Sequence, residues 1–137
     1  MSQEVLYEDK NLRLEYVPEG NYIHETWWGS TPGNRFAELL EIILKKMTET
    51  GAKGLLLDAR KHKGLGPENQ KLAADRLEQY AQANGAFKHA TIIPEDVFSK
   101  FSVESLERNL DPDAMCINRY FGNIENAKEW LKNGEIE

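Results

Sequence analysis

The sequence predicts an α/β domain in which a short N-terminal β-hairpin is followed by alternating helices and strands. Residues 12–17 alternate apolar and charged side chains, which is typical of a half-buried strand. The run GLLLDA at residues 54–59 is apolar without alternation, as in a strand covered on both faces. Helical spacing of apolar residues returns between the later strands. This order favours a mixed central sheet with parallel later strands, flanked by about four helices.

The first part of the chain predicts three strands. Residues 5–9 are a short strand, and residues 12–17 follow with the two-residue period. PEGN at residues 18–21 combines residue types that favour a tight reversal. Residues 22–29 return as the next strand, so we expect an antiparallel hairpin over residues 12–29.

Helices and strands alternate in the rest of the chain. We expect a helix over residues 35–51, a strand over residues 54–59, and a second helix from Pro67 to Gly85. The later predicted elements are a strand over 87–94, a helix over 95–110, a strand over 114–121 and a helix over 123–134 capped by Asn123. The residues of the second helix expected to face the core are Leu72, Ala73, Leu77, Tyr80 and Ala81.

Length, charge and cysteine content limit the classes of protein that fit. The 137 residues make one domain, residues 1–137, and 23 acidic against 17 basic residues give a net charge of −6. Such a chain is a poor nucleic-acid binder, because phosphate contacts need clustered Lys and Arg. No run approaches the roughly 18 apolar residues of a membrane span, and the N-terminus does not resemble a secretory signal. The single cysteine excludes an intramolecular disulfide, so we expect a cytoplasmic protein.

Three stretches carry a resemblance to a known family. They are LLLDARKHKGLGPENQ at 55–70, ATIIPEDVFSKFSVE at 90–104 and RYFGNIENAKEWLKN at 119–133. The chain resembles the small bacterial STAS-like proteins, also called SpoIIAA-like or STAS/SEC14-domain proteins, in order and spacing over nearly its whole length. The resemblance implies a mixed sheet with four helices. It also implies two kinds of relative: sigma-factor regulators switched by serine phosphorylation, and lipid-transfer proteins with an apolar cavity.

The chain departs from the phosphorylated regulators at the junction between strand and helix. Those regulators have a serine or threonine near the start of the following helix. Here the loop KHKGLGPENQ, residues 61–70, contains no hydroxyl side chain, and no serine lies between Ser30 and Ser99. We therefore expect no phosphorylation site in this loop.

The same loop does not match a nucleotide-binding cradle. Gly64 and Gly66 are followed by Pro67, which removes an amide donor where a phosphate would sit. Asp58 and Arg60, which precede the loop, share one strand parity. They are either a structural ion pair or a contact for a ligand or partner.

Ligands of open α/β sheets bind beyond the carboxyl ends of the parallel strands. At that edge we expect Asp58, Arg60, His62, Gly64, Gly66, Pro94, Glu95, Asp96, Tyr120 and Phe121 to gather. Trp27 and Trp28 are a second distinctive feature, because adjacent strand residues face opposite sides. Both are packing residues if helices cover both faces; otherwise one of them, with Trp28 as our candidate, lines an apolar pocket or a protein contact.

No catalytic or metal-binding constellation is present in the sequence. His24, His62 and His89 lie on different segments without metal-ligand spacing, and no G-x-S-x-G elbow exists. Cys116 lies among apolar residues of a strand, which favours a buried, inert thiol. We expect no enzyme, no cofactor and no metal.

Two functions are compatible with these features. The first is a non-catalytic, STAS-like regulatory module that binds a protein partner through the edge around Asp58, Arg60 and Gly66. The second is a carrier or sensor of a small apolar or lipid-like ligand, supported by aromatic residues including Trp27, Phe98, Phe101 and Tyr120. The short chain argues against a large cavity, because a core must be packed first. An exposed tryptophan or sheet edge would favour a homodimer.

Overall fold

The computed structural model describes residues 3–96 and 113–133. Its elements confirm the predicted α/β class and the predicted order of strands. They are β1 (Glu4–Glu8), β2 (Leu12–Val17), β3 (Tyr22–Gly29), α1 (Arg35–Thr50), β4 (Gly54–His62), α2 (Pro67–Asn84), β5 (Phe87–Ile92), β6 (Cys116–Phe121) and α5 (Ile124–Asn133). The described residues contain three helices where about four were expected, because the predicted helix over 95–110 lies outside them beyond Asp96.

The six strands form one mixed sheet in chain order, β1-β2-β3-β4-β5-β6. The first three strands are antiparallel, and β3 to β6 are parallel. The β2–β3 pair is the predicted hairpin. Its turn places Asn21 at φ 54° with its amide bonded to the Pro18 carbonyl, and asparagine tolerates this left-handed conformation. The parallel strands therefore end together at one edge of the sheet, where the predicted site residues were expected.

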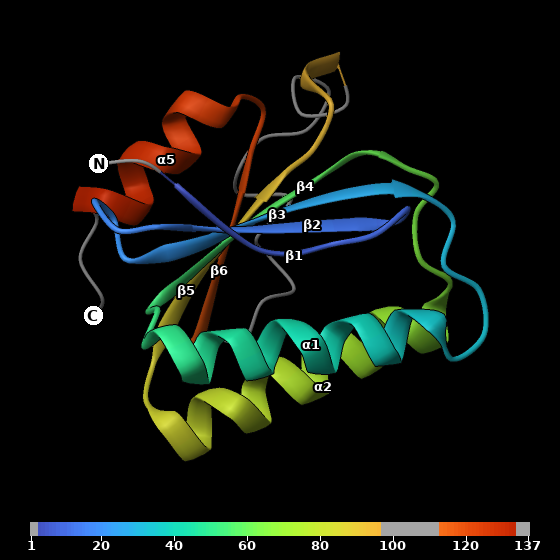
Figure 1. The fold of residues 1–137 in the computed structure, drawn as a ribbon, viewed down its shortest axis with the longest axis horizontal. Helices are drawn as coiled ribbons and strands as arrows, with labels where there is room; N and C mark the ends of the chain where they lie inside the picture. The colour runs from blue at the N-terminus through green and yellow to red at the C-terminus, as the bar shows by residue number, and fades with distance from the viewer. Residues whose placement is uncertain (1–2, 97–112, 134–137) are drawn as a thin grey trace.

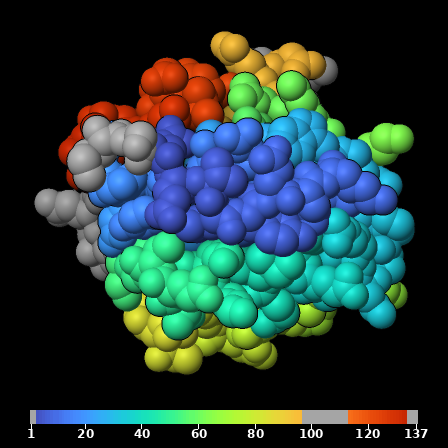
Figure 2. Space-filling model, viewed as in Figure 1, coloured from blue at the N-terminus to red at the C-terminus, as the bar shows by residue number. Residues whose placement is uncertain are grey.

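Helices cover the two faces of the sheet unequally (Figure 1). Helices α1 and α2 lie side by side on one face, and α5 lies on the other. The space-filling view shows β1 and β2 between α5 on one side and α1 on the other (Figure 2). The core beneath α1 contains most of the fully buried side chains, including Leu14, Ile23, Leu39 and Ile43, and a smaller cluster under α5 contains Leu56, Ala90 and Leu131.

The two helices on the shared face pack differently. Six side chains of α1 are buried: Phe36, Leu39, Leu40, Ile43, Leu44 and Met47. Only Leu77 and Ala81 are buried on α2. The prediction that Leu72 faces the core is wrong, because this side chain is 37% exposed. The first half of α2 therefore covers the sheet without filling the space beneath it.

Candidate functional site: a cavity between α2 and the sheet

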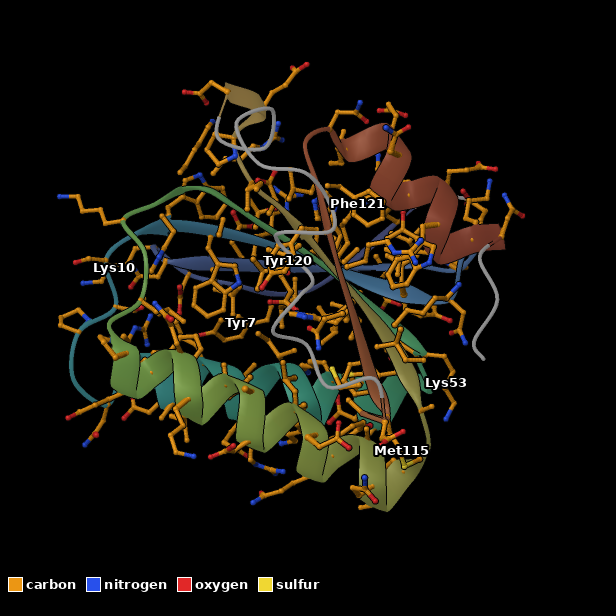
Figure 3. All side chains as sticks on the ribbon, turned by 180° about the vertical axis from the view of Figure 1, so that it is seen from behind. Tyr7, Lys10, Lys53, Met115, Tyr120 and Phe121 are labelled. Atoms are coloured by element: carbon orange, nitrogen blue, oxygen red, sulfur yellow. The ribbon has the colours of Figure 1, made fainter. Side chains whose placement is uncertain are left out.

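A cavity of about 750 Å³, partly open to solvent, lies between α2 and the sheet face formed by β4, β5 and β6. Figure 3 views the molecule from the side of β6, with Tyr120 labelled near the end of this strand and Met115 just before its start. The described side chains that line the cavity are predominantly apolar, with a few polar groups among them. They include Trp27, Leu57, Leu65, Ala73, Leu77, Ile93, Cys116 and Tyr120 as apolar or aromatic residues, and Gln70, Glu78, His89, Thr91 and Asn118 as polar ones.

The cavity exists because α2 has small side chains where it crosses the sheet. Ala73 and Ala74 line the cavity about one helical turn before the buried Leu77. An alanine leaves the volume of several methylene groups unfilled compared with the leucines of α1. So short a chain was expected to leave little volume for a large cavity, and the described residues nevertheless leave a partly open space of this size. The volume falls within the range of about 300–1,000 Å³ that small-molecule sites occupy.

A β-bulge in β4 brings His62 to this face of the sheet. Thr26 pairs with Asp58, but Trp28 pairs with Lys61, so β4 has one residue more than β3 over this interval. A bulge reverses the alternation of side chains beyond it. As a result the His62 ring meets the Trp27 ring edge-on, with their centroids 5.7 Å apart.

His62 has a structural role in the loop that closes one end of the cavity. Its Nδ1 accepts a hydrogen bond from the Gly64 amide at 2.9 Å, so its Nε2 carries the proton and donates to Thr31 Oγ1 at 3.1 Å. Burial lowers the pKa of His62, which favours this neutral form. The imidazole thus links the β3–α1 loop to the β4–α2 loop.

His89 is a buried histidine of the cavity lining. It is 8% exposed, and its Nδ1 lies 2.8 Å from Asn118 Oδ1 on β6. The Asn118 amide is oriented by its Nδ2, which donates to the Cys116 carbonyl at 3.1 Å. Its oxygen therefore accepts from His89 Nδ1–H. Burial lowers the pKa of His89 more than the bond to Asn118 raises it, so the ring is neutral with a lone pair on Nε2.

Glu78 closes the end of the cavity near the start of β6. Its carboxylate accepts hydrogen bonds from the backbone amides of Met115 at 3.1 Å and Cys116 at 3.0 Å, and from Gln82 at 2.7 Å. The amide of Cys116 contributes most to lowering the pKa of Glu78. Glu78 therefore holds α2 against β6 and has little capacity left for a ligand.

Cys116 fits the predicted inert thiol. The residue is 3% exposed, and burial raises its pKa to about 12. The thiolate, which is the nucleophilic form, is therefore essentially absent at neutral pH.

Glu25 is a buried acid behind the cavity wall. It lies on β3 between Ile23 and Trp27 on the same face, is 2% exposed, and accepts a hydrogen bond from Trp27 Nε1 at 2.9 Å. Burial raises the pKa of Glu25 to about 7, despite the opposing effect of the indole donor. Glu25 thus fixes the orientation of the Trp27 ring that lines the cavity.

Asp58 and Arg60 lie on the opposite face of the sheet from the cavity. They form a bidentate pair, with both nitrogen–oxygen distances at 2.9 Å. Burial raises the pKa of Asp58, but the hydrogen bonds from Arg60 outweigh this effect and the net pKa is lowered. The Arg60 side chain is 41% exposed, so the pair meets solvent at the edge of the sheet. The sequence predicted that Asp58, Arg60 and His62 gather at one edge of the sheet. The structure instead places the Asp58–Arg60 pair and the His62 ring on opposite faces of the sheet.

The remaining predicted site residues lie near the carboxyl ends of the parallel strands, but they do not form one cluster. Gly64 and Gly66 line an open groove of about 580 Å³ between the β3–α1 and β4–α2 loops, and Gly64 also lines the cavity. Glu95 is exposed just beyond β5. Trp28 is half-buried on the face opposite the cavity, so Trp27 is the tryptophan that lines it.

Sequence reasoning missed the polar residues of the cavity. His89 and Asn118 belong to strands that pair in register, and only strand pairing brings them together. Glu25 could have been found from the sequence, because it occupies a position with the parity of the apolar Ile23 and Trp27.

Among residues 3–96 and 113–133, no group of His, Cys, Asp and Glu has the arrangement of a metal site. None of the helices in the described part of the chain has the length and apolar character to cross a membrane.

Comparison with known proteins identifies the fold. No protein-family model and no curated protein matches the sequence. The structure is similar to the crystal structure of an uncharacterized protein of the DUF3478 family from Shewanella loihica PV-4, described as having a SpoIIAA-like fold. The two chains are 12% identical; the match covers 95% of this chain and 92% of that one, with a TM-score of 0.52. The predicted resemblance is thus confirmed for the fold: this chain has a SpoIIAA-like α/β fold.

Proposed function

We propose that this domain binds a small apolar or amphipathic molecule in the cavity between α2 and the sheet. The observation that carries the proposal is a cavity of about 750 Å³ whose lining is mostly apolar, with few polar groups. Pockets of this size and lining are the usual sites of small ligands. The function is that of a carrier or sensor without catalysis. In support of this, most polar side chains among the described lining residues bond to each other or to the backbone, and the described thiol, Cys116, has a raised pKa.

Filling the cavity tests this function. Thr91 lies on β5, half-buried and in register between Leu57 and Tyr120, and all three line the cavity. Thr91→Phe places an aromatic ring in the space without disfavouring the strand. We expect Nile red to bind the wild-type protein and to bind this variant at least about tenfold more weakly. The unfolding midpoint of the variant should not fall, because the new ring covers apolar surface.

The control variant is Ala83→Phe, which adds the same ring on an exposed position of α2. It should bind Nile red like the wild type. Native mass spectrometry of gently purified protein gives an independent readout: an adduct lost on denaturation should be present in the wild type and in Ala83→Phe, and absent from Thr91→Phe. Equal Nile red binding by both variants would place the ligand elsewhere and refute the proposal.

A second candidate function is protein binding at the edge formed by the β3–α1 and β4–α2 loops. The observation that favours it is the open groove lined by Pro32, Gly33, Gly64 and Gly66, where exposed glycines leave room for a partner's side chains. A photo-crosslinking residue, p-benzoylphenylalanine, replaces Gly66, which has open space beside it. The control replaces the exposed Glu129 on α5.

We expect a discrete cross-linked product from position 66 in the host cell and none from position 129. A product of twice the mass of the chain would identify the partner as a second copy, the homodimer. The same products from both positions, or none from either, would contradict binding at this edge.

A further inference from the structure

The polar groups of the cavity restrict the head group that a ligand can carry. Glu78 already accepts bonds from two backbone amides and from Gln82. Asn118 is engaged by His89 and by the Cys116 carbonyl. Gln70 donates to the Leu65 carbonyl. These side chains hold the walls together.

His89 differs, because one of its two ring nitrogens has no partner among the residues that the structure describes. Nδ1 donates to Asn118, and no hydrogen bond joins Nε2 to another described residue. The side chain is more than nine-tenths buried and lines the cavity. The lone pair on Nε2 is therefore available to a ligand in the cavity that brings a hydrogen-bond donor.

The charge of the lining argues against an anionic head group. None of the described residues that line the cavity is a lysine or an arginine. Glu78 lies in the lining, and Glu25 lies behind Trp27. A carboxylate or phosphate placed here would lose part of its hydration without gaining a cationic partner among the described lining residues.

We propose that the cavity binds an uncharged amphiphile whose head group, a hydroxyl or an amide N–H, donates a hydrogen bond to Nε2 of His89. The apolar tail lies among apolar residues of β4, of α2 and of the segment just beyond β5, such as Leu57, Leu77 and Ile93. This inference rests on the proposed function and adds the chemical class of the ligand. In this proposal His89 determines which head groups the cavity prefers.

Three matched probes test the class, each measured by its displacement of Nile red from the wild-type protein. Decanol has a donor head group, decyl methyl ether has the same tail without a donor, and decanoate has a charged head group. We expect decanol to bind about three- to tenfold more tightly than the ether, as one hydrogen bond of ordinary net strength gives. Decanoate should bind more weakly than decanol at neutral pH.

Two variants assign the preference to His89. His89→Leu removes the acceptor, and we expect equal affinities for decanol and the ether. His89→Gln keeps an acceptor near the place of Nε2 and should retain part of the preference for the alcohol. Circular dichroism and the unfolding midpoint check that each variant is folded, and the wild-type comparison stands without either variant.

The outcomes separate this inference from the function on which it rests. If Nile red and all three probes fail to bind the wild-type protein, the proposed function itself is wrong. If they bind but decanol and the ether have equal affinities, or decanoate binds most tightly, the cavity is a ligand site and the inference about its head group is overturned. A preference for decanol that persists in His89→Leu would also overturn the role of His89.

Discussion

Replacing Glu25 by glutamine should stabilise the protein above neutral pH and leave its stability almost unchanged near pH 5. The carboxyl group is 2% exposed, and burial raises its pKa to about 7 in the folded protein from an ordinary value of 4.5. Between these values the folded protein holds a proton that the unfolded chain releases. The wild-type free energy of unfolding therefore falls as pH rises from about 4.5 through 7, because the folded protein must bury the charged carboxylate. By pH 8 the decrease due to Glu25 reaches roughly 3 kcal/mol. Glutamine has no charge to bury and keeps an oxygen that can accept from Trp27 Nε1.

Urea unfolding of the wild type and Glu25→Gln from pH 5 to pH 8 measures this effect. The difference between the two proteins is the informative quantity, because His24, His62 and His89 have pKa values lowered by burial and change stability in the opposite direction. Glu4→Gln, at an exposed position of β1, is the control and should show no comparable trend. A difference that is independent of pH would show that Glu25 does not titrate in this range.

The fold was predictable because its signals are local. The two-residue period of residues 12–17 and the turn at 18–21 gave the hairpin, and both are present. Helix ends were also marked in the sequence: Gly51 adopts φ 73° after α1, and the Asn123 side chain accepts from the Asn126 amide at 2.8 Å at the start of α5. Each of these choices depends on neighbouring residues alone.

The site was less predictable, because it depends on the register of β4 against β3 and on how closely α2 packs on the sheet. Asp58, Arg60 and His62 were expected to gather at one edge of the sheet, and a bulge of one residue in β4 places His62 on the other face from the pair. Nothing in the sequence of β4 marks that bulge. Ala73 was expected to face the core, but its small size was not recognised as leaving space, and Ala74 was not singled out. The small volume of both alanines helps to create the cavity. A count of large apolar residues on α1 and α2 would have indicated the difference.

Replacing Lys88 by methionine should be the most damaging change on the face opposite the cavity. Lys88 is 7% exposed, and its ammonium donates to the carbonyls of Trp130 at 2.8 Å and Leu131 at 3.0 Å, in the last turn of α5. It also lies 5.5 Å from the centre of the Trp130 ring. Carbonyls in the last turn of a helix generally lack partners within it, and the described part of α5, which ends at Asn133, contains none for these two; a cation at this end is also favoured by the helix dipole. Methionine keeps the apolar stem and removes the donors, so we expect a loss of about 2–4 kcal/mol.

Urea unfolding measures the loss, with Lys132→Met as the control because Lys132 is exposed on the same helix and should change stability by less than about 0.5 kcal/mol. A loss below about 1 kcal/mol for Lys88→Met would mean that apolar packing of α5, such as Leu131 against Gly54, is enough to hold the helix.

Nile red affinity should stay unchanged in Lys88→Met, because Lys88 points to the α5 face while the neighbouring His89 lines the cavity. A fall in both stability and affinity would instead show that the two faces of the sheet are coupled through β5, and that the cavity depends on how α5 is packed.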